Sequence, residues 1–315
     1  MIEKIKENLS KVIIGKKDVI DKAVVGLLSN GHMLIEDVPG TGKTTLAKAI
    51  AISFGAKFKR IQFTPDLLPS DITGITVYDL HKNEFRVRFG PIFTNFLLAD
   101  EINRGTPKTQ SALLEAMAEY KANIDGVDYP LDPPFIVIAT ENPIEYEGTF
   151  PLPEAQLDRF IMRFPIGYPE KDKEREILFA EKELFPIDEL KQVCSISELI
   201  NLQEKVRKVF VHSSIADYIV DISNATRNHS DIYLGASPRG TLFLMRVSQA
   251  WAFIAERDFV IPDDVKKAVV DVFNHRILLR ADARLRGVRV NTVLEEIMGG
   301  IKVPVIGDFS KGEII

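Results

Sequence analysis

The chain has 315 residues, of which 45% are hydrophobic and 27% are charged, and its formal net charge is −5. This length suits two domains better than one, and the composition is that of a globular protein with a sizeable core. The acidic balance argues against a dedicated nucleic-acid binder. The single cysteine, Cys194, excludes an internal disulfide and favours a reducing compartment.

No apolar run approaches the roughly 20 residues that a membrane-spanning helix needs. The N-terminal residues 1–8 mix charges of both signs and lack the apolar core of a signal peptide. We therefore expect a soluble, cytoplasmic protein without a membrane span.

The first half of the chain alternates short apolar runs with helical patterns, which predicts an α/β fold with a parallel sheet between helices. Several runs are apolar throughout, as strands covered on both faces should be. Pro165 suits an edge strand, because proline cannot donate to a sheet ladder. The predicted strands are residues 33–36, 57–62, 96–100, 135–140 and 163–166.

A β-hairpin is predicted between the second and third of these strands. Residues 74–78 and 84–89 alternate as strands do, and residues 79–83 form the turn. A structural hairpin with a solvated face and a functional one both remain open. Alternation puts the apolar residues of its second strand on one face and the charged ones on the other, namely Phe85, Val87 and Phe89 against Glu84, Arg86 and Arg88.

The second half of the chain has the apolar spacing of helices, which predicts a small all-helical domain. We place the boundary near residues 168–195, so that the α/β core spans residues 1–180 and the helical domain residues 181–315. The apolar residues that carry the pattern are Ile215, Tyr218, Ile219 and Ile222, then Leu244, Val247, Trp251 and Ile254, then Val265, Ala268, Val269 and Val272.

A phosphate-binding loop is the strongest local signal, at Pro39-Gly-Thr-Gly-Lys-Thr-Thr45. It follows a predicted strand and precedes a predicted helix. Gly40 and Gly42 allow successive backbone N–H groups to surround phosphate oxygens, and the helix N-terminus favours anions. Lys43 would reach the β- and γ-phosphates, and the Thr44 hydroxyl would ligate Mg²⁺.

One position departs from the general phosphate-loop pattern. That pattern begins with a glycine, and this chain has Asp37 there. Gly40 and the triplet that follows it at residues 42–44 are present. The loop prediction therefore rests on these residues and on the strand and helix around them.

Two adjacent carboxylates, Asp100 and Glu101, end the predicted strand 96–100. The carboxyl end of a parallel strand opens into the ligand crevice of an α/β sheet. We expect Asp100 to hold Mg²⁺ opposite Thr44, and Glu101 to act as general base on the attacking water. Alone, such a pair is also typical of a solvated turn.

Three further residues fit phosphoryl transfer, which depends on positioning and charge neutralisation. Asn142 follows the strand at residues 135–140 and could bridge the attacking water, although it is also an ordinary turn residue before Pro143. Arg159 precedes the last predicted strand, and Arg239 leads into a helix of the second domain. Each arginine by itself would be read as a surface charge.

These motifs together resemble the MoxR branch of the AAA+ ATPases, over nearly the whole chain. Residues 63–74 also resemble the segment that leads into the helix-2 insert of this branch, in agreement with the predicted hairpin. The stretch at Ile13–Gly15 resembles the adenine-pocket segment of AAA+ proteins. The motifs that carry the resemblance lie at residues 36–44, 98–104, 107–117, 139–145, 148–160 and 235–239.

The resemblance implies roles for individual residues. Asp100 with Glu101 would be the Walker B motif, Asn142 sensor 1, Arg159 the arginine finger and Arg239 sensor 2. The phosphate loop would be Walker A, and Asp37 also occurs in relatives of this branch. The residues expected to bind ATP and Mg²⁺ are Ile14, Gly15, Pro39, Gly40, Thr41, Gly42, Lys43, Thr44, Thr45 and Asp100.

The resemblance also implies an assembly and a task. AAA+ proteins commonly form hexameric rings with ATP at subunit interfaces, which would place Arg159 at the γ-phosphate of a neighbour. MoxR-type ATPases are thought to mature or activate protein partners as chaperones, often with proteins that carry a von Willebrand factor A domain.

Two other functions are weighed against this one. A nucleic-acid motor could use Arg86 and Arg88 of the hairpin on phosphates, but the acidic charge and the lack of an appended DNA-binding motif argue against it. A nucleotide-gated scaffold would bind ATP and barely hydrolyse it, and Glu101 and Arg159 argue against that. Metal catalysis without nucleotide is disfavoured, because the five histidines are scattered along the sequence.

Overall fold

The computed structural model describes residues 1–38, 40–143, 148–180 and 187–304. The chain divides into two compact units. The first contains Met1–Phe160 and Phe164–Asn201, and the second contains Ile161–Arg163 and Leu202–Ile315.

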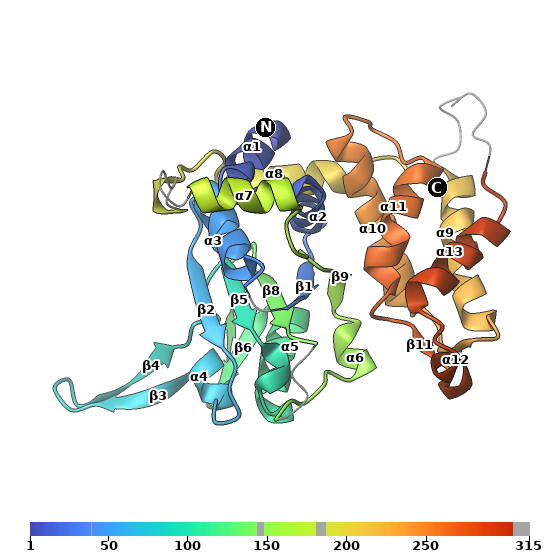
Figure 1. The fold of residues 1–315 in the computed structure, drawn as a ribbon. Helices are drawn as coiled ribbons and strands as arrows, with labels where there is room; N and C mark the ends of the chain where they lie inside the picture. Colours follow the sequence, from blue (N-terminus) through green and yellow to red (C-terminus); the bar gives the residue numbers. More distant parts are fainter. Residues whose placement is uncertain (39, 144–147, 181–186, 305–315) are drawn as a thin grey trace. The chain divides into compact units, whose positions relative to one another are not determined.

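A five-stranded sheet forms the centre of the first unit, in the order β2-β5-β8-β1-β9. The pairs β1–β8, β2–β5 and β5–β8 are parallel, which confirms the predicted α/β architecture. Figure 1 shows the strands side by side among the helices of this unit. The strands are β1 (His32–Glu36), β2 (Phe58–Gln62), β5 (Phe96–Asp100), β8 (Ile136–Glu141) and β9 (Phe160–Phe164).

The central strands are apolar because both of their faces are covered. All five residues of β5 are buried, as are the first five of β8, and this burial is typical of parallel sheets. The helices of this unit are α1 (Ile2–Ser10), α2 (Lys17–Leu28), α3 (Lys43–Ser53), α4 (Pro69–Thr73), α5 (Pro107–Glu119), α6 (Glu154–Leu157) and α7 (Lys171–Ala180), with 3-10 turns at Ile102–Arg104 and Ile187–Glu189.

The last strand begins earlier than the sequence predicts. The prediction was residues 163–166, but β9 covers Phe160–Phe164. Phe160, Ile161 and Met162 are fully buried, and this burial defines the strand. Pro165 follows its last residue, where the missing N–H costs no ladder bond. The strand lies at the edge of the sheet, as the proline indicated.

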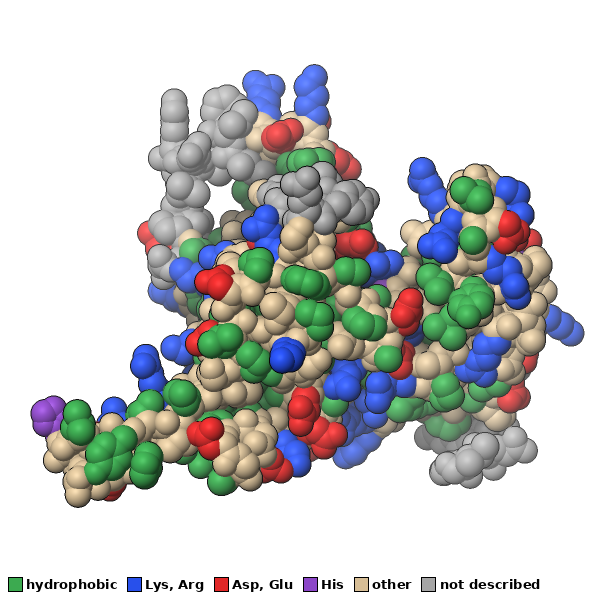
Figure 2. Space-filling model, turned by 90° about the horizontal axis from the view of Figure 1, so that it is seen from below, with side chains coloured by type: hydrophobic (Ala, Val, Ile, Leu, Met, Phe, Trp, Pro, Cys, Tyr) green, Lys and Arg blue, Asp and Glu red, His purple; other side chains and the backbone are tan. Residues whose placement is uncertain are grey.

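The predicted hairpin is present as β3 (Gly74–Asp79) and β4 (Glu84–Phe89), paired antiparallel in full register from Gly74 opposite Phe89 to Asp79 opposite Glu84. It extends away from the sheet (Figure 1). Its apolar side chains remain in solvent: Tyr78 is 45%, Phe85 75% and Leu80 84% exposed. Hydrophobic side chains gather toward the end of this hairpin in Figure 2.

A second hairpin was not predicted. It consists of β6 (Lys121–Ile124) and β7 (Val127–Pro130), joined at Asp125 and Gly126, which have φ values of 51° and 86°. The Asp-Gly pair is a strong signal for a two-residue hairpin turn, and it was available in the sequence. The Asp125 carboxylate accepts a hydrogen bond from Thr76 N at 3.0 Å, which joins the two hairpins.

The second unit is helical, as predicted, and contains one feature that the helical spacing did not indicate. A short antiparallel ribbon joins β10 (Ile232–Leu234) to β11 (Leu278–Leu279). Strands this short carry no periodicity that a sequence could show. The helices are α9 (Ser213–Asn228), α10 (Pro238–Ile254), α11 (Pro262–Phe273), α12 (Ala281–Leu285) and α13 (Val290–Gly300), while α8 (Ile196–Arg207) crosses the division between the units.

The units divide after Asn201, about twenty residues beyond the boundary expected at residue 180. Residues 191–194 remain with the first unit because its helices bind them. Asn8 Nδ2 of α1 donates to Lys191 O at 3.0 Å, and Ser53 O of α3 accepts from the backbone of Cys194 at 3.0 Å. The Cys194 side chain is buried there, and burial raises its thiol pKa to about 11, so it packs as a small apolar group.

None of the described helices is long and apolar enough to cross a membrane.

Candidate active site

The phosphate loop follows β1 at the carboxyl end of the sheet and ends where α3 begins at Lys43. Gly40 and Gly42 have φ values of 83° and 89°, in the left-handed region that favours glycine. No described atom lies within 4 Å of the position that a Cβ would take at either residue. The glycines are therefore required by the conformation of the loop. Pro39 of the predicted loop lies outside the described residues.

Lys43 is nearly buried, at 9% exposure, and its Nζ donates to the main-chain carbonyl of Asp37 at 2.6 Å. Burial lowers the pKa of Lys43, and the carboxylates of Asp37, Asp100 and Glu101 act in the opposite direction. The buried lysine of the loop therefore lies in the electrostatic field of the acid pair at the end of β5.

Asp100 is the last residue of β5 and is 8% exposed. Its Oδ1 accepts a hydrogen bond from Thr140 Oγ1 at 2.6 Å. Its Oδ2 accepts two from Arg60, from Nη2 at 2.6 Å and from Nε at 3.1 Å. Both oxygens are therefore held in place by side chains from the two strands that flank β5.

Glu101 has a φ of 53°, a backbone conformation that is uncommon for residues other than glycine. Its N–H donates to Thr140 Oγ1 at 2.9 Å, which fixes this turn against β8. Its carboxylate accepts from Gln62 Nε2 at 2.9 Å and lies 3.3 Å from Arg104 Nε. Such conformations persist where surrounding contacts hold them, and they cluster at functional sites.

Asn142 lies just beyond β8 at the same edge of the sheet and is 3% exposed. Its carbonyl accepts a hydrogen bond from Asn103 Nδ2 at 3.4 Å. Asn142 is therefore buried at the end of β8, the strand that lies between β5 and β1.

The two arginines belong to different units. Arg159 is half-buried directly before β9, and its Nη1 donates to the carbonyl of Leu114 in α5. Arg239 is exposed in the first turn of α10, in the second unit. The hydrogen bond of Arg159 therefore joins it to α5.

The stretch at Ile13–Gly15 connects α1 to α2. Gly15 has a φ of 73°, and a Cβ there would lie 2.6 Å from Cγ of Lys173 in α7. The Lys173 side chain thus covers this residue, and no larger residue than glycine fits without a shift.

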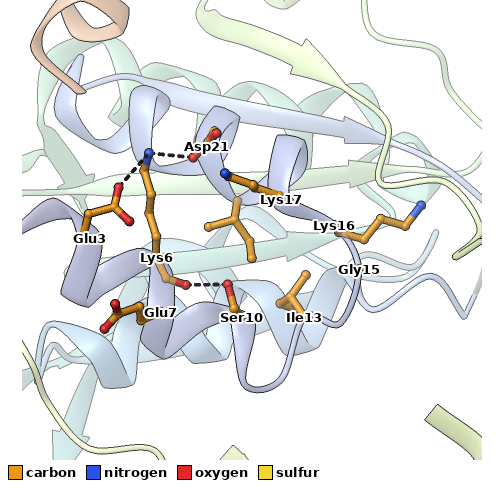
Figure 3. Close-up of a pocket in the computed structure, with 10 residues that line it drawn as sticks. Glu3, Lys6, Glu7, Ser10, Ile13, Gly15, Lys16, Lys17 and Asp21 are labelled. Carbon is orange, nitrogen blue, oxygen red and sulfur yellow. Dashed lines mark hydrogen bonds and ion pairs between the residues drawn. The ribbon is translucent and has the colours of Figure 1, made fainter. Parts of the chain in front are cut away.

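A cavity of about 420 Å³ lies beside this stretch, between α1 and α2 (Figure 3). Inside it Lys6 Nζ is 2.8 Å from Asp21 and 3.6 Å from Glu3. None of its lining residues belongs to the phosphate loop or to the end of β5, so it is separate from the site described above. The lining residues are Glu3, Lys6, Glu7, Ser10, Ile13, Gly15, Lys16, Lys17, Ile20 and Asp21.

Three residues of the site were missed by sequence reasoning, namely Arg60, Gln62 and Thr140. Gln62 ends β2 and Thr140 lies one residue before the end of β8, whereas Arg60 is the middle residue of β2. Polar residues at strand ends were the available signal, but the neighbours of β5 are known only from the strand order.

The donor set suits a hard divalent cation. The Asp100 carboxylate and the Thr44 hydroxyl are oxygen ligands, which Mg²⁺ prefers, usually with phosphates and water completing its shell. Among the described residues no group of three or more His, Cys, Asp or Glu side chains could hold a metal by itself. One carboxylate and one hydroxyl would need phosphate and water oxygens to complete the shell of a magnesium ion.

Comparison with known proteins agrees with this geometry. Residues 32–162 match the family described as ATPase family associated with various cellular activities (AAA), and residues 224–297 match the AAA lid domain. A proposed ATPase from Cytophaga hutchinsonii, solved by crystallography, is 39% identical with a TM-score of 0.90, covering 96% of this chain and 95% of that one.

Two relatives match over nearly the full chain. The uncharacterized protein YeaC of Bacillus subtilis is 48% identical over 97% of this chain and 95% of its own length. The chaperone MoxR1 of Mycobacterium tuberculosis is 41% identical over 95% of this chain and 81% of its own length. With its phosphate loop and acidic strand end, the chain therefore belongs to the MoxR family of AAA+ ATPases and is a P-loop ATPase.

Proposed function

We propose that Mg·ATP is hydrolysed at the carboxyl edge of the sheet by the residues that the sequence indicated. Lys43 binds the β- and γ-phosphates, and the backbone N–H groups around Gly40 and Gly42 surround their oxygens. Bound between Thr44 and Asp100, Mg²⁺ would neutralise charge on the transferring phosphoryl group. The observation that carries this proposal is that the phosphate loop after β1 and the acid pair at the end of β5 lie at the same edge of the sheet, on the two sides of β8.

Glu101 is the proposed general base. Its strained backbone directs the side chain beyond the end of β5, where Gln62 and Arg104 hold the carboxylate. From this position it orients and deprotonates the attacking water, while the buried amide of Asn142 helps to place that water. The contact with Gln62 has to loosen or shift when water binds, because both use the same carboxylate.

We propose that Arg159 completes the site of an adjoining copy in a ring, most simply a hexamer. Arginine presents five N–H donors, so the bond from Nη1 to Leu114 O leaves others for a phosphate. In this arrangement the contact with α5 holds the guanidinium ready before assembly. The exposed Arg239 would act as a second cation at the nucleotide.

The task that we propose is the chaperone-like remodelling, maturation or activation of a protein partner, with a von Willebrand factor A domain protein as one candidate. Its support is the similarity to a protein named chaperone MoxR1, over 95% of this chain and 81% of that protein. The apolar end of the β3–β4 hairpin favours a protein over a nucleic acid. Arg86, which a nucleic-acid motor would use, lies 3.3 Å from Asp79 in an ion pair.

The experiment is a pull-down from the native cell with the Glu101→Gln variant loaded with Mg·ATP, compared with the Lys43→Ala variant. A protein partner retained by the first variant and lost from the second is expected. Recovery of nucleic acid, or ATPase activity stimulated by DNA with a steep salt dependence, would overturn the proposed task in favour of a nucleic-acid motor.

A further inference from the structure

Asp37 stands where the general phosphate-loop pattern has its first glycine, and it is 7% exposed. Its Oδ1 accepts a hydrogen bond from Val38 N at 2.8 Å. Its Oδ2 accepts two more, from Ile166 N at 2.9 Å and from Gly167 N at 2.5 Å. A carboxylate thus binds three backbone donors, and hydrogen bonds to a charged acceptor are the stronger kind.

The backbone of Asp37 makes two further connections. Its N–H donates to Glu141 O at 3.1 Å, at the end of β8 and next to Asn142. Its carbonyl accepts from Lys43 Nζ at 2.6 Å. One residue therefore joins the ends of β1 and β8, the segment after β9, and the lysine that reaches the phosphates.

The segment held by the carboxylate is restrained from a second side. Gly167 has a φ of 70°, and Lys16 Nζ donates to the carbonyl of the next residue, Tyr168, at 2.5 Å. Lys16 follows Gly15 directly. Residues 166–168 are thus bound on one side by Asp37, at the end of β1, and on the other by Lys16, directly before α2.

The charge of Asp37 opposes the binding of an anion. A carboxylate beside a loop that surrounds phosphates repels them, and a glycine at this position would not. The carboxylate therefore contributes something other than affinity for the nucleotide, and the contacts above indicate rigidity of the loop.

We propose that Asp37 is a positioning residue for ATP hydrolysis. Its carboxylate binds the amides of Ile166 and Gly167 and thereby fixes the backbone of Asp37 directly before the loop. Because the main-chain carbonyl of Asp37 accepts the hydrogen bond from Lys43, a fixed backbone also fixes the position of the lysine. This inference rests on the ATPase activity of the chain. Misplacement of a reacting group by about 1 Å can lower a rate about 100-fold, so the benefit of a fixed loop can exceed the cost of the charge.

The decisive variant is Asp37→Asn, which keeps the size of the side chain but replaces one acceptor oxygen with an NH₂ group. We expect kcat to fall about 10- to 100-fold. The Kd for Mg·ATP should weaken by less than about threefold or become tighter, because a repelling charge of about one unit is removed. A loop that merely unfolds would lose rate and affinity together.

Two further variants complete the series. Asp37→Gly restores the general pattern and should lose kcat as the Asn variant does. Asp37→Glu retains a carboxylate and should recover part of the rate. Asp71→Asn is the matched control, since Asp71 Oδ2 also accepts a backbone N–H, that of Leu68 at 2.9 Å. It should leave kcat within about twofold of wild type.

Hydrogen exchange gives a readout that does not depend on activity. In a peptide that covers Ile166 and Gly167, the Asn and Gly variants should lose protection, whereas the Asp71 control should not. An unchanged kcat in Asp37→Asn or Asp37→Gly, a parallel loss of Mg·ATP affinity, or unchanged exchange would each overturn the proposal. A wild-type protein without turnover would instead refute the ATPase assignment, and the exchange result would still report whether the carboxylate holds the segment.

Discussion

Arg60 donates two hydrogen bonds to one carboxylate oxygen of Asp100, from Nη2 at 2.6 Å and from Nε at 3.1 Å. This guanidinium therefore occupies one of the two carboxylate oxygens of the residue that we propose as a ligand of Mg²⁺. Arg60 is 47% exposed at its side chain and Asp100 only 11%, so the pair is partly screened by solvent. A competition between Arg60 and Mg²⁺ for Asp100 follows from this geometry.

Replacing Arg60 should ease the binding of Mg²⁺. In Arg60→Gln the competing ion pair is lost, and pairs of this exposure contribute up to about 1 kcal/mol, which is roughly a fivefold change. The Mg²⁺ concentration that gives half-maximal ATPase activity should fall about two- to fivefold in a magnesium titration. Arg86→Gln, which breaks the exposed pair with Asp79 on the hairpin, is the control. An unchanged Mg²⁺ requirement would exclude the competition.

Loss of the proposed base should separate binding from turnover. Glu101→Gln keeps the contacts of Lys43 and Asp100 with the nucleotide, but its amide cannot accept the proton of water. We expect kcat to fall about 10²- to 10⁴-fold while nucleotide affinity is retained. Steady-state turnover and equilibrium binding measure the two effects, and normal turnover would refute the assigned role.

The role of Arg159 across an interface can be tested by mixing subunits. Arg159→Ala should lower turnover by a factor on the order of 10³, as for other arginine fingers. Mixing it with Lys43→Ala subunits should restore part of the activity, because a site then forms from one intact loop and one intact arginine. No recovery despite normal co-assembly would show that the arginine serves its own subunit.

His32 should make the stability of the first unit depend on pH. Its Nδ1 accepts from Val137 N at 3.0 Å and its Nε2 lies 3.1 Å from Met117 O, so the neutral ring carries its proton on Nε2. Burial lowers its pKa from 6.5 to about 4. The folded state thus excludes a proton that the unfolded chain binds, and stability falls as the pH drops from about 6.5 toward 4.

The size of this effect follows from the shift. Between pH 7 and pH 5 the contribution of His32 should cost about 2 kcal/mol of unfolding free energy. Denaturant unfolding at both pH values measures it. In His32→Gln the difference between the two pH values should shrink by about this amount, whereas His81→Gln, on the exposed turn of the hairpin, should not change it. An equal pH dependence in all three proteins would exclude the assignment.

Much of the fold could be predicted from local sequence patterns. The apolar strands, the turn glycines at Gly40 and Gly42, and the acid pair at Asp100 are each encoded within a few residues, so they could be read directly. The start of β9 was misplaced because burial of Phe160–Met162 depends on neighbours that are distant in sequence. The β6–β7 hairpin was overlooked although its Asp-Gly turn is a local signal.

The division between the units was expected near residue 180 but follows Asn201. What keeps the later residues with the first unit is a set of backbone contacts with Asn8 and Ser53, and such contacts leave no mark on composition.

By itself the sequence determined a P-loop ATPase with its loop, its acid pair and a helical second domain, because those features depend on short-range spacing. Only the tertiary structure decided how the pair is held. Arg60 and Thr140 reach Asp100 from strands 40 positions away in either direction, and Ile166 meets Asp37 across 129 positions. Such partners are chosen by strand order, which depends on how the whole sheet packs and not on any single segment.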